Sequence, residues 1–167
     1  MSFLIRKAIP EDIASILALI TELAVFEKEP DAVELTEDEL YEHGFGPNAF
    51  YKCLVAEVDN KVVGIALFYN RFSTWKGKAV HLEDLIVTQE HRGTGIGAAL
   101  YNEVLLYAAQ EGVRRIQWEV LDWNEVAIKF YEASGAEMKK DWYLAQMHTK
   151  EIQAYAKTHK SILNESI

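Results

Sequence analysis

The stretch Ala79-Val-His-Leu-Glu-Asp-Leu-Ile-Val-Thr-Gln-Glu-His-Arg-Gly-Thr-Gly-Ile-Gly-Ala-Ala-Leu100 joins a strand to a helix through a turn rich in glycine. Residues 80–87 are mostly apolar and predict the strand. Apolar residues then recur at every fourth position, as on one face of a helix: Ile96, Leu100, Val104 and Ala108. The order is therefore strand, glycine-rich turn over residues 92–97, and helix.

This turn suits an anion. Glycine lets the backbone approach a ligand closely, and the first turn of a helix presents unpaired N–H groups with partial positive charge. Arg92 adds a fixed charge with a planar set of donors. We predict a phosphate or pyrophosphate as the ligand, and a glycine-rich turn without any ligand is the alternative.

Three glycine-rich patterns compete for this turn. A P-loop ends in Gly-Lys-Ser/Thr, and this turn ends in Gly-Ala-Ala at residues 97–99, so a P-loop is excluded. The dinucleotide pattern G-x-G-x-x-G/A fits Gly93, Gly95 and Ala98, but it normally opens a large doubly wound domain and here lies past mid-chain. The third pattern, Arg/Gln-x-x-Gly-x-Gly/Ala after a strand, fits residues 92–97.

The third pattern resembles the coenzyme A loop of the Gcn5-related N-acetyltransferases, the GNAT superfamily. A second stretch, Asn124-Glu-Val-Ala-Ile-Lys-Phe-Tyr-Glu-Ala-Ser-Gly135, is similar to that family's Asn-x-x-Ala-x-x-Phe-Tyr-x-x-x-Gly segment. Two such segments at this separation are a stronger signal than either one alone.

Composition narrows the class of protein. The chain has 167 residues, half of them apolar, and its one cysteine, Cys53, excludes a disulfide framework within the chain. The net charge of −9 argues against a nucleic-acid partner and is compatible with a cationic substrate. Apolar runs fall short of the roughly 20 residues that span a membrane. No signal peptide is evident, so we expect a cytoplasmic protein.

Two side-chain chemistries are not expected here. The five histidines show no metal-ligand spacing, so we predict no metal site. Cys53 lies in an apolar strand, where an inert buried thiol is the usual case, and this disfavours an acyl-carrying cysteine.

Strands and helices alternate along the chain. We expect strands at residues 3–7, 51–58, 62–69, 80–87, 114–121 and 142–147. We expect helices at residues 10–23, 96–111, 124–134 and 149–157, and a short one opened by the capping box Thr36-x-x-Glu39. Asp59-Asn60 is a plausible hairpin turn, and residues 71–78 read as a polar loop.

The helix between the strands at 80–87 and 114–121 makes those two strands a parallel pair. We therefore expect an α/β fold in a single domain over residues 1–167. Its sheet is mixed and mostly antiparallel, with a central parallel strand pair and helices on both faces. This order of elements matches the GNAT fold independently of the glycine-rich turn.

A closer resemblance is to the spermidine/spermine (diamine) acetyltransferases and the thialysine acetyltransferases. It is carried by Leu82-Glu-Asp84, His91-Arg-Gly93 and Trp123-Asn-Glu125, and extends over nearly the whole chain up to Trp142. The resemblance implies acetyl-CoA as cofactor, a small amine as acceptor, and a homodimer. It places the cofactor at Leu85, Ile86, Val87, Arg92, Gly93, Thr94, Gly95, Ile96, Gly97, Ala98, Asn124, Ala127 and Tyr131. It places the acceptor at Phe26, Glu27, Glu83, Trp118 and Glu119.

The resemblance implies direct transfer, in which a neutral amine attacks the thioester carbonyl. The main chain of residues 85–87 would polarise that carbonyl, and Tyr131 is the expected general acid for the leaving thiolate. Glu83 could accept the amine proton, directly or through water. Each role has a structural alternative: Tyr131 as a core residue, Glu83 as a structural carboxylate beside Asp84, and Asn124 as a helix cap only.

Two departures from the diamine enzymes bear on the acceptor. Phe26-Glu27 stands where that family carries Tyr-Glu, and Lys139-Lys140-Asp141 stands where it carries acids. Both changes weaken the case for a long polycation. We expect a diamine, a short polyamine or a lysine-like amino acid such as thialysine. The acid-rich segment 27–42 would then attract a cation, and a solvated helix face is the alternative.

Two other functions compete with an amine acetyltransferase. One is an acyl-CoA-binding regulatory module without turnover. The other is an NAD-type oxidoreductase, which the dinucleotide pattern allows.

Overall fold

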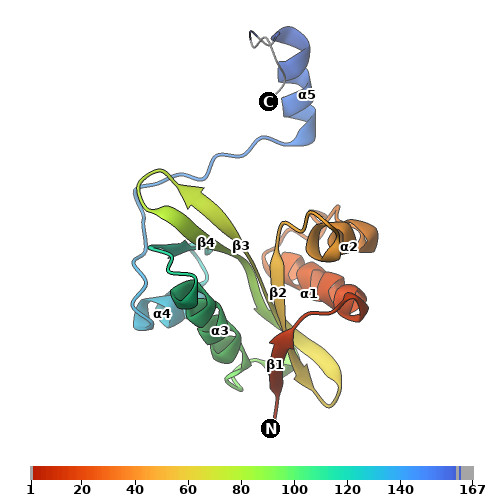
Figure 1. Ribbon diagram of the computed structural model, residues 1–167, viewed down its shortest axis with the longest axis vertical. Coiled ribbons are helices and arrows are strands. Elements are labelled where there is room, and N and C mark those ends of the chain that lie inside the picture. The colour runs from red at the N-terminus through yellow and green to blue at the C-terminus, as the bar shows by residue number, and fades with distance from the viewer. Residues whose placement is uncertain (1, 161, 163–167) are drawn as a thin grey trace. The chain divides into compact units, whose positions relative to one another are not determined.

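The protein is described by a computed structural model for residues 2–160 and 162. The described chain forms two compact units, Met1–Leu121 and Asp122–Ile167. Figure 1 follows the elements of each unit in turn. The two units are treated separately below, and a single domain over residues 1–167 stays a prediction.

A mixed sheet forms the centre of the first unit. Its strands are β1 (Leu4–Lys7), β2 (Lys52–Val58), β3 (Lys61–Ser73), β4 (Gly77–Val87) and β5 (Ile116–Gln117). Within the described residues they lie in the order β1-β2-β3-β4-β5, with three antiparallel pairings and a parallel pairing of β4 with β5. The predicted α/β class, with its parallel pair, is confirmed.

Helices cover both faces of this sheet (Figure 1). They are α1 (Ile13–Phe26), α2 (Glu37–Phe45) and α3 (Ile96–Gln110). Ile16 of α1 and Leu40 of α2 are fully buried in one core cluster with Val55 and Ile65 of the sheet. The helix α3 packs against β3 and β4. The second unit contains α4 (Glu125–Ala133) and α5 (Thr149–Thr158).

Local sequence signals explain several boundaries. Thr36 caps α2, accepting from the Glu39 N–H while the Glu39 carboxylate accepts from the Thr36 N–H at 2.9 Å, so the predicted capping box is confirmed. Asp59 and Asn60 have φ values of 48° and 62°, which fits a tight turn between β2 and β3.

The expected elements differ from the structure in three places. Most of the predicted polar loop 71–78 belongs to a long hairpin, because β3 continues to Ser73 and β4 begins at Gly77. The strand predicted at 114–121 pairs over two residues only. Residues 142–147 form no strand in the described chain. Their side chains are exposed, and β propensity without a hydrogen-bonded neighbour is insufficient to make a strand.

A β-bulge interrupts β4 at Glu83. Leu67 of β3 pairs with Asp84 and the next residue, Phe68, pairs with Leu82, so Glu83 is the extra residue on β4. A bulge locally re-aims side chains and increases the twist of a strand. The two acids Glu83 and Asp84 are therefore displayed by an irregular part of β4.

Candidate functional site

The glycine-rich turn has the geometry of an anion cradle. Gly93 and Gly95 take φ values of 74° and 89°, a left-handed backbone that only glycine adopts at low cost. A Cβ atom at either position would meet no atom within 4 Å, so the space in front of the turn is open. The helix α3 starts after Gly95 with no side-chain cap. The N–H groups of residues 96–98 therefore lack helical acceptors and face an open site.

The Arg92 side chain contacts β4 and α1, and its role toward the cofactor stays a prediction. Its Nε donates to the main-chain oxygen of Val87 at 2.9 Å, and its guanidinium carbon lies 4.8 Å from the centre of the Phe26 ring. Its Nη2 is 3.6 Å from a carboxylate oxygen of Glu22. The side chain thus connects the turn to β4 and to the end of α1. The main chain of the turn is the better donor set for an anion.

The outer edge of β4 is open next to this turn. The strand β5 pairs with β4 only at Val80 and His81, and no other strand of the described residues pairs with that edge. The main-chain oxygen of Val87 points away from β3, because it accepts from Arg92. Main-chain groups alternate along a strand, so those of Leu85 and Val87 both face the open edge. The Ile86 side chain is buried.

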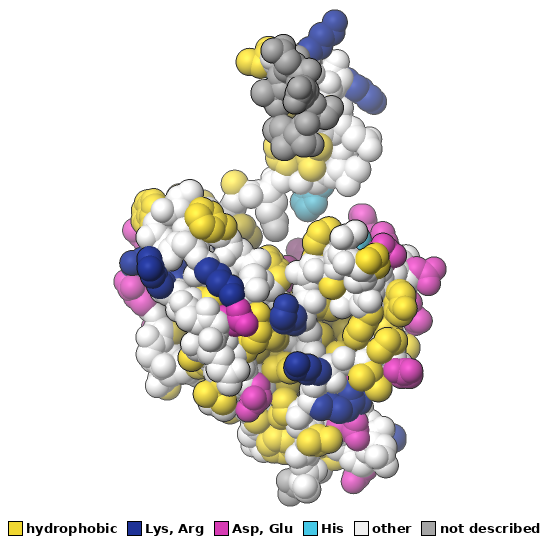
Figure 2. Space-filling model, in the orientation of Figure 1, with side chains coloured by type: hydrophobic (Ala, Val, Ile, Leu, Met, Phe, Trp, Pro, Cys, Tyr) yellow, Lys and Arg dark blue, Asp and Glu magenta, His cyan; other side chains and the backbone are white. Residues whose placement is uncertain are grey.

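A small cavity of about 240 Å³ lies between β4 and α2. Glu83 and Asp84 line it from β4, and Glu39 and His43 line it from α2. Burial, followed by the charges of Glu83 and Glu27, raises the pKa of Asp84 from 3.8 to about 7. Acidic side chains also gather over α2 at the surface, as Figure 2 shows. This region can attract a cation.

Glu27 belongs to the same acidic region. It caps the C-terminal end of α1, directly after Phe26, and burial raises the pKa of its carboxyl group. Since the charge of Glu27 contributes to the pKa of Asp84, the end of α1 and the bulge of β4 share one electrostatic environment.

The Glu83 carboxylate accepts one hydrogen bond and lies close to one histidine, two contacts that the sequence analysis missed. One oxygen accepts from the Tyr69 hydroxyl at 3.0 Å and lies 3.4 Å from Nε2 of His81. The same Nε2 is 3.2 Å from a carboxylate oxygen of Glu119. Burial, together with the bond to Glu83, raises the pKa of Tyr69 to about 12, so its hydroxyl stays a donor. The sequence offered one sign of these contacts, the polar His81 two residues before Glu83.

The structure thus brings together Glu83 and Glu119, two of the predicted acceptor residues. Trp118, the residue before Glu119, is directed elsewhere: its ring meets Tyr101 of α3 edge-on at 5.6 Å. The remaining acceptor residues, Phe26 and Glu27, lie at the end of α1.

The second unit holds three of the predicted cofactor residues. Asn124 caps α4, and its Oδ1 accepts from the N–H of Ala127 at 3.2 Å. Tyr131 is buried in the same helix, with its ring centre 5.3 Å from that of Phe130. The capping role of Asn124 is therefore confirmed, and the cofactor roles of Asn124, Ala127 and Tyr131 stay predictions.

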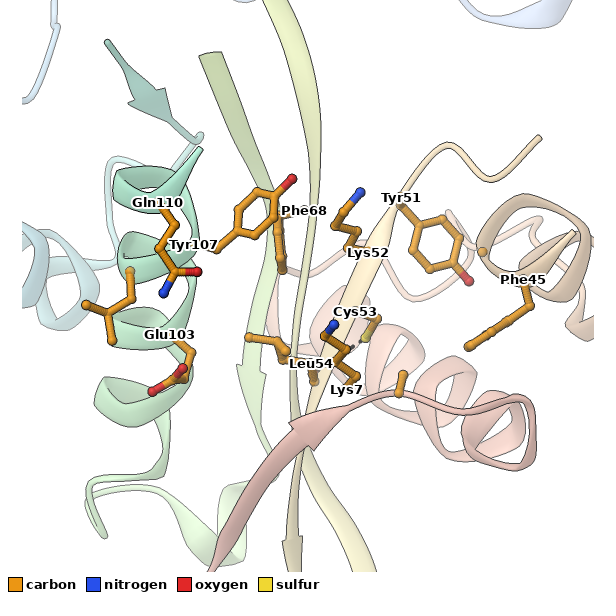
Figure 3. A pocket seen from close by; sticks show the side chains of 13 residues that line it. Lys7, Phe45, Tyr51, Lys52, Cys53, Leu54, Phe68, Glu103, Tyr107 and Gln110 are labelled. Carbon is orange, nitrogen blue, oxygen red and sulfur yellow. Dashed lines mark hydrogen bonds between the residues drawn. The ribbon is translucent and has the colours of Figure 1, made fainter. Parts of the chain in front are cut away.

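A larger cavity, of about 400 Å³, lies in the first unit (Figure 3). Glu103, Tyr107 and Gln110 line it from α3, and Lys52 extends over the Tyr107 ring at 5.8 Å. None of the predicted site residues lines it. Cys53 does, but burial raises the pKa of its thiol and keeps it protonated.

Within residues 2–160 and 162, no group of three or more acidic, histidine or cysteine side chains could hold a metal ion. None of the helices over the same range is long and apolar enough to cross a membrane.

Comparison with known proteins identifies a family, two relatives by sequence and a solved structure with a similar fold. The profile of the acetyltransferase (GNAT) family matches residues 14–136. The chain is 42% identical over 142 residues to a thialysine N-epsilon-acetyltransferase of Bos taurus, covering 80% of this chain and 84% of that protein. It is 36% identical to a spermidine/spermine N(1)-acetyltransferase-like protein of Homo sapiens, over 90% of this chain and 23% of that protein. An integron cassette protein from V. cholerae shares the fold, with a TM-score of 0.77 at 23% identity, covering 94% of this chain and 99% of that one.

Asp84→Asn tests the electrostatics of the small cavity. The folded-state pKa of Asp84, about 7, lies above its ordinary 3.8, so ionising this carboxyl costs stability as pH rises through that window. The variant avoids this cost. Between pH 4 and pH 8, the free energy of unfolding of the variant minus that of the parent should increase by up to about 4 kcal/mol. Urea unfolding at both pH values measures it. The exposed Glu90→Gln is the control, and a constant difference would contradict the burial argument.

Proposed function

Because the chain belongs to the GNAT family of N-acetyltransferases, we propose that it transfers the acetyl group of acetyl-CoA to a primary amine of a small cationic acceptor. One observation carries the acceptor class: the acids Glu39, Glu83 and Asp84 line the same small cavity between β4 and α2. An ammonium group would be attracted there, and an anionic or apolar acceptor would not.

The residues of the first unit fit coenzyme A. The open, left-handed glycine turn suits a pyrophosphate, with the N–H groups of residues 93–98 as donors. The outward main-chain groups of Leu85 and Val87 suit the amide-bearing pantetheine arm, and one of these N–H groups can polarise the acetyl carbonyl. Acetyl-CoA itself supplies the thioester that the amine attacks.

Glu83 is the proposed base. Carboxylates concentrate the cationic acceptor, but they also favour its protonated form, and only the neutral amine attacks a carbonyl. Glu83 must therefore take a proton from the reacting amine. Its side chain is half exposed, so water can carry that proton away or lie between Glu83 and the amine.

Tyr131 is the proposed acid, which protonates the departing thiolate sulfur. This assignment rests on the family segment from Asn124 to Gly135 and is supported by the burial of Tyr131, which limits competing hydrogen bonds from water. Asn124 shapes the start of the same helix whichever role it has toward the cofactor.

The preferred acceptor is the side-chain amine of a lysine-like amino acid such as thialysine, or a short diamine. The thialysine relative covers most of this chain at 42% identity, and Phe26 replaces the tyrosine of the diamine enzymes. We also propose, on resemblance alone, that the enzyme is a cytoplasmic homodimer. The direct test is a panel of amines with acetyl-CoA, read as free thiol release. Coenzyme A binding without thiol release from any amine would favour a regulatory module.

Gly95→Ala tests the anion cradle. The added methyl group opposes the left-handed backbone and stands where the backbone should approach the pyrophosphate. We expect the Kd for coenzyme A to rise by about tenfold or more, since the loss of one main-chain contact to a charged ligand is worth at least that. Calorimetric titration measures it. Gly77→Ala is a matched control, because Gly77 has a φ of 76° and equally open surroundings. Equal effects of both variants would remove the phosphate assignment.

Tyr131→Phe keeps the ring and removes the proton. If Tyr131 is the general acid, kcat should fall by about 10²–10⁴ while the Kd for coenzyme A stays nearly unchanged. Stopped-flow thiol release provides the rate. Tyr143→Phe, at a fully exposed position of the same unit, is the control. A loss below roughly threefold would return Tyr131 to a packing role.

Glu27→Gln tests the cationic acceptor. Removing this charge should raise the amine KM by about fivefold, as expected for one partly exposed ion pair, and leave the acetyl-CoA KM nearly constant. Added salt should reproduce part of the loss in the parent enzyme. The exposed Glu34→Gln serves as the control within the same acid-rich segment. If a monoamine without a second charge is an equally good substrate, the acids are an ordinary solvated surface.

A further inference from the structure

We propose that His81 is a positioning residue, which holds Glu83 and Glu119 together as one carboxylate pair for the acceptor ammonium, and that Arg71 keeps the His81 imidazole in the tautomer this task requires. The inference rests on the proposed function for the identity of the acceptor. The hydrogen-bond arrangement itself can be tested without any substrate.

His81 is buried in the sheet at the point where the pairing of β4 with β5 ends. It is only 4% exposed, and it is the last residue of β4 that pairs with β5 before the open edge begins. Tyr69 is its partner on β3, with the two rings 5.1 Å apart. The imidazole therefore has little freedom, and a group bonded to it is fixed relative to three strands.

The contacts of the ring assign its tautomer. Nη1 of Arg71 lies 3.4 Å from Nδ1 of His81. A guanidinium group can only donate, so Nδ1 must offer its lone pair and the ring proton must be on Nε2. That Nε2–H faces Glu83 at 3.4 Å and Glu119 at 3.2 Å. One buried ring nitrogen thus lies close to two carboxylates from different parts of the chain.

The shared donor leaves the carboxylate pair ready for a cation. The charged and titratable groups around His81 are Arg71 and Tyr69 from β3, Glu83 from β4, and Glu119 from the segment after β5. The Glu83 and Glu119 side chains are 50% and 56% exposed, so solvent reaches the face opposite His81. Two carboxylates around one N–H retain mutual repulsion, which an ammonium between them would relieve.

The same geometry argues against His81 as the proton acceptor. A proton on Nδ1 would set an imidazolium N–H against the guanidinium of Arg71, and both groups would then be donors with no acceptor between them. The proton of the acceptor ammonium therefore passes to the Glu83 carboxylate and from there to water. His81 acts by orienting the two carboxylates.

Kinetics of His81→Phe and His81→Gln test the positioning role. Phenylalanine keeps a planar ring but has no donor, so kcat should fall about tenfold and the amine KM should rise, which matches loss of a hydrogen bond to a charged group. Glutamine supplies an N–H and should restore most of both.

Tyr69→Phe is the matched control for these variants. It removes the hydroxyl donor to Glu83 but leaves the contact between His81 and Glu119, so the amine KM should stay near the parent value. The Kd for coenzyme A should be unchanged in all three variants. Equal losses in the Phe and Gln variants of His81 would overturn the inference.

Nitrogen-15 NMR of the histidine ring gives a test that needs no turnover. In the parent protein we expect the Nε2–H tautomer of His81, and in Arg71→Met we expect the Nδ1–H tautomer to become populated. An imidazolium at pH 7 in the parent, or an unaltered ring in Arg71→Met, would overturn the inference. If the parent releases no thiol with any amine, the proposed function fails, and this NMR result still decides the arrangement of His81.

Discussion

The early end of the pairing between β4 and β5 is the constraint on which the site depends. Beyond His81, the outer edge of β4 has no partner strand among the described residues. The Arg92 side chain donates to the Val87 oxygen, and a ligand or solvent can satisfy the other outward main-chain groups. A ligand with amide groups can pair with such an edge much as a strand does. The glycine turn after Val87 lies at one end of this edge, and the acidic bulge is close to the other. The cofactor and the acceptor would thus meet along one strand.

The acidic residues of the site destabilise the folded protein, because their carboxylates repel one another. Asp84 is buried near two other carboxylates, and the donors that face Glu83 are few: one hydroxyl and one shared imidazole N–H. Functional sites commonly retain such unfavourable charges, because the ligand supplies the missing counter-charge. An acceptor with two positive groups would relieve this repulsion better than one with a single group. Net charge alone could not reveal this, since a charge of −9 also serves solubility.

The sequence was informative where local rules decide structure. The capping box at Thr36, the turn at Asp59 and the helix after Gly95 all follow from residue types at fixed spacing. The sequence was least informative where the structure of a segment depends on a partner far away in the chain. Residues 142–147 have strong β propensity but no paired neighbour, and the pairing of β5 ends after two residues. His81 and Glu119 are far apart in the chain, so no periodic pattern in the sequence could have predicted the contact between their side chains.

The position of Arg92 over the Phe26 ring has a consequence for how this enzyme could change. Phe26 directly precedes Glu27 and is a proposed acceptor residue, and its ring supports the arginine that connects the glycine-rich turn to β4. A substitution at residue 26 that widened the acceptor pocket would also remove the platform under Arg92. New acceptor preferences obtained through this position would therefore be accompanied by a looser cofactor turn. Divergence of specificity should proceed more easily through residues of α2, which contribute to the small cavity and make no contact of this kind with the turn.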